Sequence, residues 1–194
     1  MTSSDETILP ADAKARAAAR VGDSIDAADL VDLVAAEIRV GFACAEFNGG
    51  ITDRMLTAAL DALEAAGCDM DGVVVSWAPG AFELPLVARG LAASGRVDAV
   101  VALGAVIRGD TGHYDFVAGE CAAGLQRVQL DSGLPVVFGV LTTDTVDQAL
   151  VRSLPDHTNK GAEAARTALG TVAVLRGVED LPSGTRVGFS VGGR

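Results

Sequence analysis

The segment VDAVVALGAVI, residues 97–107, decides the fold class of this 194-residue chain. It is apolar at almost every position, whereas a strand with one face in water alternates apolar and polar side chains. Three similar runs occur elsewhere, namely IRVGFACAEF (38–47), GVVVSW (72–77) and LPVVFGVLTT (134–143). Strands of this kind are typical of a parallel sheet whose two faces are both covered.

Helix-patterned segments alternate with these four runs. They span residues 51–67, 81–95, 113–133, 145–154 and 159–177. This alternation predicts a doubly wound α/β fold, in which a four-stranded parallel sheet lies between two layers of helices. Ligands of such folds bind beyond the carboxyl ends of the strands, so the residues that follow each strand are the candidates for a functional site.

The length of the chain fits one domain of ordinary size. Residues 1–36 are rich in Ala and Asp without strong apolar periodicity, and we expect a partly ordered leader there. The compact domain is predicted to span residues 37–180. Residues 181–194 are Gly-rich and are predicted to form a flexible C-terminal tail.

Composition narrows the partners and the location of the protein. The net charge is −11 and no continuous basic stripe occurs, so we expect no nucleic-acid partner. No apolar run suits a signal peptide or a membrane span, so we expect a cytoplasmic protein without a membrane partner. Cys44, Cys68 and Cys121 lie far apart in apolar surroundings and are predicted to be buried thiols, not disulfides or metal ligands.

The segment IRGDTGHYDF, residues 107–116, has the residues of an anion site. Glycines, Asp110 and Thr111 stand between a buried strand and a helix, whose N-terminal backbone N–H groups can bind an anion. Capping of the helix by Asp110 or Thr111 explains the same residues equally well. His113 follows in the first turn, where an imidazole can pass protons near neutral pH, and it is our candidate general acid and base. His157, in a polar loop, is expected to be solvated.

Phe47 follows the first strand and precedes Asn48-Gly49-Gly50. Its ring can stack on a planar ligand at the crevice, or it can be a core residue that covers the end of the sheet. The residues alone favour neither interpretation.

The segment WAPGAFELP, residues 77–85, contains a turn directly after the second strand, and Glu83 is expected in the first turn of the helix that follows. The helix dipole alone explains a carboxylate there. The alternative is that Glu83, with the backbone of Ala81 and Phe82, binds a polyol or the edge of a heterocycle.

Arg152 and Lys160 flank a break between two helices, at which Pro155 interrupts the helical pattern. They are either ordinary surface charges or cations for a phosphate, since the planar guanidinium group matches phosphate oxygens.

Taken together, these segments resemble the lumazine synthase family from about residue 39 to residue 176. Five motifs carry the resemblance, in the family's order and without an insertion or deletion between Phe47 and Lys160. They are FNGGITDRML (47–56), WAPGAFELP (77–85), GAVIRGDTGHYDF (104–116), PVVFGVLTTD (135–144) and NKGAEAA (159–165).

The resemblance implies a flavodoxin-like α/β/α sandwich and a reaction of riboflavin biosynthesis. In that reaction, 5-amino-6-(D-ribitylamino)uracil condenses with 3,4-dihydroxy-2-butanone 4-phosphate to give 6,7-dimethyl-8-ribityllumazine, phosphate and water. No redox step occurs, so no cofactor and no metal are expected. The family also implies a homo-oligomer, either a pentamer or an icosahedral 60-mer, with active sites between neighbouring subunits.

By position, the resemblance assigns one set of residues to the ribitylamino-uracil. Phe47 is expected to stack on the uracil ring, and Glu83 to hydrogen-bond the ribityl chain. The remaining contacts come from Ala81 and Phe82, and from Ala105, Val106 and Ile107, which are expected to line the uracil pocket.

A second set is assigned to the ketone phosphate. Asp110, Thr111 and Arg152 are expected to hold its phosphate, and His113 to donate and accept protons. Phe138 is expected to close the pocket from the adjacent subunit, and Lys160 to contact substrate.

The sequence departs from the family pattern at Gly112, where members often have proline or another residue with a side chain, and in SLPDHTNKG, residues 153–161. These departures leave open a flavin-binding or shell-forming homologue without activity. A separate alternative keeps the fold but changes the chemistry, namely a riboflavin synthase of the archaeal type. A generic flavodoxin-like nucleotide-binding domain fits less well, because FNGGITD lacks a hydroxyl-rich phosphate loop.

Overall fold

A computed structural model describes residues 9–21 and 23–181 of the chain. One all-parallel sheet is formed by β1 (Val40–Ala45), β2 (Val74–Ala78), β3 (Ala99–Ile107) and β4 (Val136–Thr143). The strand order is β2-β1-β3-β4, which is the flavodoxin-like order as far as the fourth strand. The predicted fold class is confirmed.

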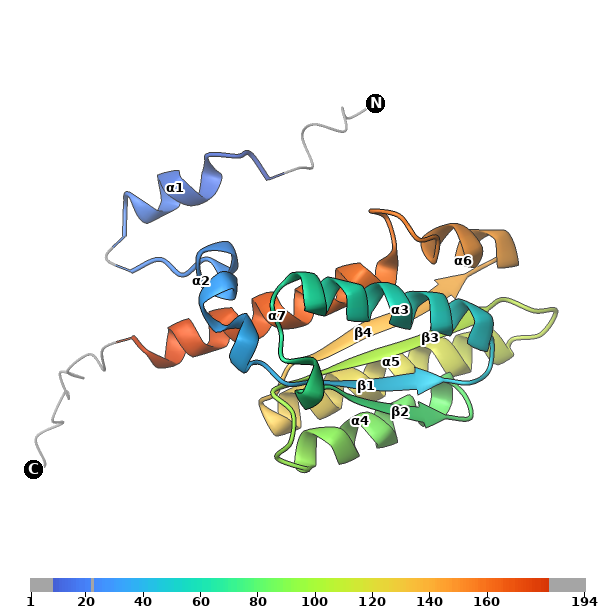
Figure 1. The fold of residues 1–194 in the computed structure, drawn as a ribbon. Coiled ribbons are helices and arrows are strands. Elements are labelled where there is room, and N and C mark those ends of the chain that lie inside the picture. The colour runs from blue at the N-terminus through green and yellow to red at the C-terminus, as the bar shows by residue number, and fades with distance from the viewer. Residues whose placement is uncertain (1–8, 22, 182–194) are drawn as a thin grey trace, which may run out of the picture.

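Helices cover both faces of this sheet (Figure 1). One face carries α3 (Gly49–Ala65) and α7 (Lys160–Glu179), and the other carries α4 (Leu84–Ala93) and α5 (His113–Ser132). The shorter helices are α1 (Ala13–Ala18), α2 (Ala27–Val34) and α6 (Val146–Arg152), and the 3₁₀ turns are η2 (Ala35–Glu37), η3 (Met70–Gly72) and η4 (Ala81–Glu83).

The two central strands, β1 and β3, are buried on both faces, as their continuous apolar sequence predicts. Successive side chains of a strand point to opposite faces, so each strand supplies two separate cores. In β1, Phe42 packs with α3 and α7, whereas its neighbour Ala43 packs with α4 and α5. The helices can therefore not all lie on one side of the sheet.

The contact between α3 and α7 depends on Gly161, because α7 begins against the backbone of α3. A Cβ atom at Gly161 would lie 2.0 Å from the carbonyl oxygen of Met55. Asn159, which is buried, accepts a hydrogen bond from the Gly161 N–H at 2.8 Å and donates one to the Leu154 carbonyl at 2.8 Å. This cap begins α7 directly beside α3.

The leader contains α1 and α2. Helix α2 packs on the far end of α7, where Ala27 and Leu30 approach Gly170 and Gly177. None of the residues of α1, all within the described part of the chain, is buried, and α1 stands apart from the sandwich in Figure 1. Residues 1–8, 22 and 182–194, which include most of the predicted tail, lie outside the described residues. The predicted domain limits at residues 37 and 180 stay predictions.

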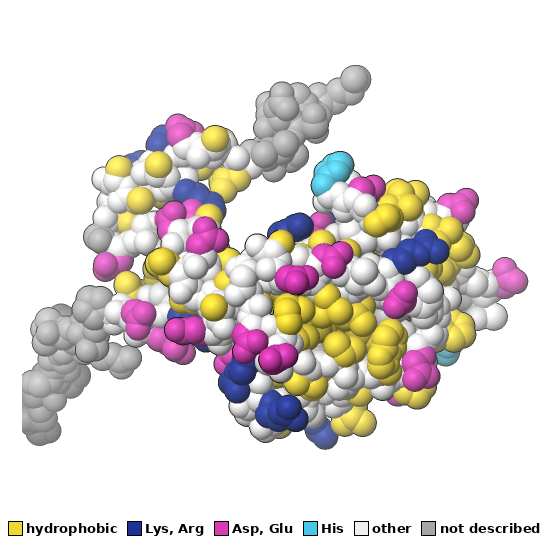
Figure 2. All heavy atoms as spheres, in the orientation of Figure 1, with side chains coloured by type: hydrophobic (Ala, Val, Ile, Leu, Met, Phe, Trp, Pro, Cys, Tyr) yellow, Lys and Arg dark blue, Asp and Glu magenta, His cyan; other side chains and the backbone are white. Residues whose placement is uncertain are grey.

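Burial and charge follow the expectations from composition. All three cysteines are buried, and burial raises the pKa of Cys44 and of Cys121 to about 12, so both thiols stay protonated. In Figure 2, acidic side chains are scattered over the visible face and the basic ones form small separate groups. A band of hydrophobic side chains crosses the same face near the edge strand β2, where Val75 and Trp77 are partly exposed. Within residues 9–21 and 23–181, no helix combines the length and hydropathy needed to span a membrane.

Gly161→Ala should destabilise the fold, because the nearest atoms to the new methyl group belong to the backbone of α3 and cannot rotate away. We expect a loss of about 3 kcal/mol, as for other overpacked cores. The measurement is urea unfolding followed by circular dichroism.

The matched control is Gly170→Ala in the same helix. There a Cβ atom would meet Ala27 at 3.4 Å, an ordinary van der Waals distance. This variant should be neutral or more stable by up to about 1 kcal/mol, since alanine favours helix. Equal unfolding midpoints for the two variants would contradict the proposed importance of the α3–α7 contact.

Candidate functional site

A pocket of about 640 Å³ lies at the carboxyl ends of β1 and β3. The chain leaves β1 toward α3 on one face and leaves β3 toward α5 on the other, so the two loops diverge here. Such a switch point is where doubly wound sheets bind ligands. The residues around the pocket are Phe47, Pro79, Gly80, Ala81, Phe82, Glu83, Ala105, Val106, Ile107, Gly109, Thr111, His113, Tyr114, Phe116 and Val117.

Phe47 is held at the pocket by an extension of the β1–β2 pairing. The Glu46 N–H donates to the Ala78 carbonyl at 2.8 Å, and the Phe47 N–H donates to the Pro79 carbonyl at 3.1 Å. Phe47 is 72% exposed and borders the pocket, so it is not a core residue in this chain.

Asn48 makes the turn that separates Phe47 from α3. Its φ of 60° places it in the left-handed region, which asparagine tolerates better than most residues. Its side-chain amide donates to the Ala105 carbonyl at 2.8 Å, which joins the end of β1 to the end of β3 beneath the pocket. Sequence reasoning missed this residue, although an asparagine before two glycines is a signal for such a turn.

The turn after β2 brings Ala81, Phe82 and Glu83 to the pocket. Ala81 is buried, whereas Phe82 is 55% exposed. The Glu83 carboxylate lies against the turn, where a Cβ atom at Gly80 would be only 3.1 Å from its Oε2. Glu83 stands at the end of η4, one residue before α4 begins, and not within the first turn of that helix as expected.

Residues 105–107 of β3 form a wall of the pocket, as the resemblance implies. Ala105 and Val106 are buried and Ile107 is half-buried. The wall is apolar, which suits the face of a planar ring.

The loop after β3 leads into α5, which begins at His113. Gly112 stands at the N-cap and brings no side chain to the first turn, while the Thr111 hydroxyl accepts a long hydrogen bond from the His113 N–H at 3.4 Å. Thr111 and His113 both border the pocket. Asp110 is exposed in the same loop, is not among the residues that border the pocket, and makes no hydrogen bond to α5 within the described residues.

Gly112 has an ordinary backbone conformation, with φ at −69°. A Cβ atom on Gly112 would meet nothing within 4 Å. The glycine is therefore not required by the geometry of this loop, and a residue with a side chain fits there.

Phe138, Arg152 and Lys160 lie elsewhere, at the open edge of β4. They border a separate hollow of about 380 Å³, and within the described part of one chain none of the three reaches the pocket of His113. Phe138 is 42% exposed. Arg152 donates to the Gln148 carbonyl at 2.9 Å, and Lys160 pairs with Glu163. The sequence-predicted residues thus form two groups on different parts of the surface.

The α5 side of the pocket was missed from the sequence. Tyr114, Phe116 and Val117 border it together with His113. The signal was present, because residues three and four apart share one face of a helix, which places Phe116 and Val117 beside His113.

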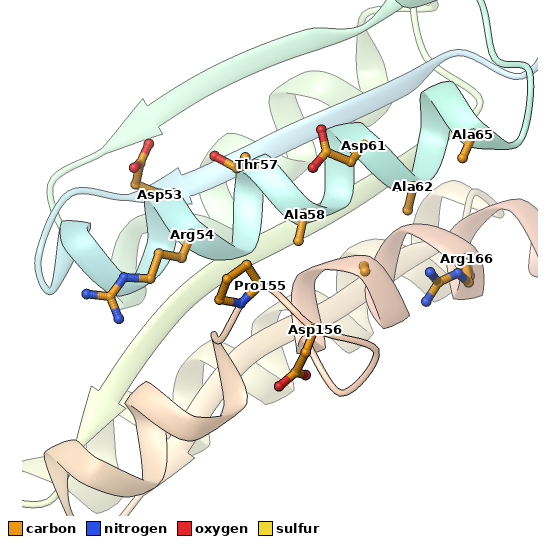
Figure 3. Close-up of a pocket in the computed structure, with 11 residues that line it drawn as sticks. Asp53, Arg54, Thr57, Ala58, Asp61, Ala62, Ala65, Pro155, Asp156 and Arg166 are labelled. Carbon is orange, nitrogen blue, oxygen red and sulfur yellow. The ribbon is translucent and has the colours of Figure 1, made fainter.

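Figure 3 shows another groove, of about 600 Å³, between α3 and α7. Side chains of both signs surround it, among them Asp61 and Arg166, and Pro155 and Asp156 border it from the loop after α6. None of the predicted substrate residues borders this groove, and neither does His157, which is exposed. In the described residues, no three His, Cys, Asp or Glu side chains come together as metal ligands would.

Comparison with known proteins shows the family of the chain. A protein-family model described as 6,7-dimethyl-8-ribityllumazine synthase matches residues 37–176. The chain is also 52% identical over 148 residues to 6,7-dimethyl-8-ribityllumazine synthase of Edwardsiella ictaluri (strain 93-146), an alignment that covers 76% of this chain and 95% of that protein. The chain therefore belongs to the 6,7-dimethyl-8-ribityllumazine synthase family.

Proposed function

We propose that the protein condenses 5-amino-6-(D-ribitylamino)uracil with 3,4-dihydroxy-2-butanone 4-phosphate to give 6,7-dimethyl-8-ribityllumazine, phosphate and water. The observation that carries the proposal is one pocket that combines an exposed aromatic ring, Phe47, a carboxylate, Glu83, and an imidazole, His113, at the N-terminus of a long helix. The family assignment supports the same reaction.

The ribitylamino-uracil occupies the part of the pocket between Phe47 and β3. The exposed phenyl ring stacks on the uracil, with the apolar residues 105–107 on the wall beneath. Glu83, whose carboxylate lies at the turn after β2, accepts hydrogen bonds from the ribityl hydroxyl groups, and Ala81 and Phe82 contact the same substrate.

The ketone phosphate binds at the start of α5. Backbone N–H groups at a helix N-terminus favour an anion, and the Thr111 hydroxyl lies beside them. Asp110 stands in the same loop but does not border the pocket, so the proposed phosphate contacts are those of Thr111 and the helix N-terminus. This placement brings the ketone close to His113.

The reaction needs proton transfers but no redox step. The 5-amino group of the uracil attacks the ketone, one water leaves to form an imine, and phosphate is eliminated. The ribitylamino nitrogen then attacks the remaining carbonyl carbon, and loss of a second water closes the ring. His113 takes up and returns protons at these steps. Placement of the two substrates face to face supplies most of the acceleration, roughly 7–11 kcal/mol.

The site is completed by a second copy of the chain. Phe138, Arg152 and Lys160 form the complementary half-site at the β4 edge, and no Lys or Arg is among the described residues that border the pocket of His113. An interface in which unlike surfaces meet forms a ring when the rotation between neighbours closes, which suits the pentamer, alone or within a 60-mer, that the sequence led us to expect. Assembly size and the expected cytoplasmic location stay predictions.

The two alternatives from the sequence, a riboflavin synthase and an inactive homologue, are not favoured, since the matched family and the relative both bear the name of the lumazine-forming enzyme. The deciding experiment is an assay of the purified protein with both substrates, which follows lumazine and inorganic phosphate together. Equal amounts of both products above the spontaneous rate support the proposal. Neither product from a folded oligomer rejects it.

His113→Ala should lower kcat by about 10²- to 10⁴-fold and leave a measurable enzyme, because general acid–base help is the smaller part of the acceleration. Steady-state kinetics checks this. His157→Ala is the matched control, since His157 is exposed and outside the pocket, and it should keep wild-type rates. Complete loss of turnover in a folded, assembled His113→Ala protein would show that the histidine does more than transfer protons.

Arg152→Ala should raise the KM for the ketone phosphate about tenfold or more, as expected when a charge-assisted hydrogen bond to phosphate is lost. The KM for the uracil should change little. Arg166→Ala, on α7 but at the groove of Figure 3, should leave both KM values unchanged. A parallel rise of both KM values for Arg152→Ala would reject the phosphate contact.

Mixed oligomers test whether two chains share a site. Co-expression of His113→Ala and Arg152→Ala chains under different affinity tags, and purification through both tags, should give oligomers in which about a quarter of the sites are intact, since each such site takes its two halves from different variants. Their activity at low ketone phosphate should therefore exceed that of either variant alone. Activity equal to the average of the two variants means that each site lies within one chain.

A further inference from the structure

Arg108 is the first residue after β3 and stands at the start of the loop 108–112 that leads to His113. Its guanidinium group touches three side chains. Nε donates to Asp144 Oδ1 at 3.0 Å, Nη1 donates to Asp115 Oδ1 at 3.2 Å, and the group lies over the Tyr114 ring at 3.9 Å from its centre. Arg108 itself is not among the residues that border the pocket.

These contacts connect the two ends of the loop. Asp144 follows the last residue of β4, while Tyr114 and Asp115 lie in the first turn of α5. The Arg108 backbone N–H also donates to the Thr143 carbonyl at 2.9 Å. The loop between contains Gly109 and Gly112, at neither of which an added Cβ atom would meet a neighbour within 4 Å. The side chain of Arg108 thus restrains a loop that has little packing of its own.

Arg108 also balances the negative charges around the loop. Asp115 and Asp144 are carboxylates at the base of a loop whose proposed ligand is an anion, and Asp110 lies within the loop itself. An unpaired carboxylate close to a phosphate weakens its binding by repulsion. The hydrogen bond to Asp144, with the charge of Asp115, raises the pKa of Arg108 above its already high value, so it carries its positive charge at any working pH.

We infer that Arg108 is a positioning residue for the ketone phosphate. It holds Thr111 and the N-terminus of α5 in the binding arrangement and neutralises Asp115 and Asp144 beside the bound phosphate. This inference rests on the proposed function of the loop. The inference gives Arg108 no direct contact with the phosphate, because Arg108 does not border the pocket and its Nε and Nη1 are engaged by Asp144 and Asp115.

The experiment compares Arg108→Gln, Arg108→Lys and wild type in steady-state kinetics with each substrate varied in turn, and measures inhibition by inorganic phosphate. Arg108→Gln should raise both the KM for the ketone phosphate and the inhibition constant of inorganic phosphate by about tenfold. The kcat and the KM for the uracil should stay within about twofold. Arg108→Lys keeps the charge but not the planar fork, and should give a rise of about threefold.

Arg39→Gln is the matched control. Arg39 forms a similar exposed ion pair with Asp98, 3.1 Å from Nε to Oδ2, but it precedes β1 at the opposite end of the strands. Its removal should leave every kinetic constant unchanged.

Two results would overturn the inference. One is an unchanged KM for the ketone phosphate in folded, assembled Arg108→Gln. The other is an equal rise of both KM values in Arg108→Gln together with a fall of its unfolding midpoint, when Arg39→Gln shows the same fall. A residue needed only for stability would behave in this way. If the wild-type protein itself has no turnover, the proposed function fails, and calorimetric binding of inorganic phosphate to wild type and Arg108→Gln still tests the role of Arg108.

Discussion

Burial of both faces of β1 and β3 is the constraint on which the rest of the structure depends. Each of these strands presents apolar side chains to two sides, so helices have to cover both. The chain must then change faces between β1 and β3, and it leaves a crevice where the loops diverge. The pocket of Phe47 and His113 is that crevice, so its position follows from packing and not from any demand of chemistry.

Small residues in the two cores leave the large aromatic ones for the surface. Of the five phenylalanines in the described residues, only Phe42 is buried, whereas Phe47, Phe82, Phe116 and Phe138 are exposed. All four exposed rings border one or the other of the two hollows that hold the proposed half-sites. Alanine and glycine make this possible, because they let α3 and α7 approach closely at Gly161. The tightly packed core and the exposed aromatic side chains therefore both follow from the high content of small residues in the core.

Much of the fold and of the pocket could be predicted from the sequence, because the informative residues are close to one another along the chain. Continuous apolar runs identified the four strands, and the residues directly after them, such as Phe47 and His113, proved to border one pocket. Arg108 and Asn48 could not be understood in this way. Their roles depend on Asp144 and Ala105, which are distant in sequence and adjacent only after the strands have paired. Likewise, the residue pattern alone does not separate Phe138 and Arg152 from the other site residues, and only the family resemblance assigned Phe138 to an adjacent subunit. Their separation in one chain arises from the order of the strands.

The division of the proposed site between two hollows also affects how damage spreads. Each chain presents both a pocket and a β4-edge hollow, so in a closed ring each chain takes part in two sites, one with each neighbour. The number of working sites then equals the number of intact contacts between neighbours, not the number of intact chains. A chain that enters a ring but has a defective pocket and a defective β4-edge hollow disables two sites. The fraction of activity lost in a mixed population is then larger than the fraction of defective chains. In such a protein, defective chains lower the activity of the intact chains with which they assemble.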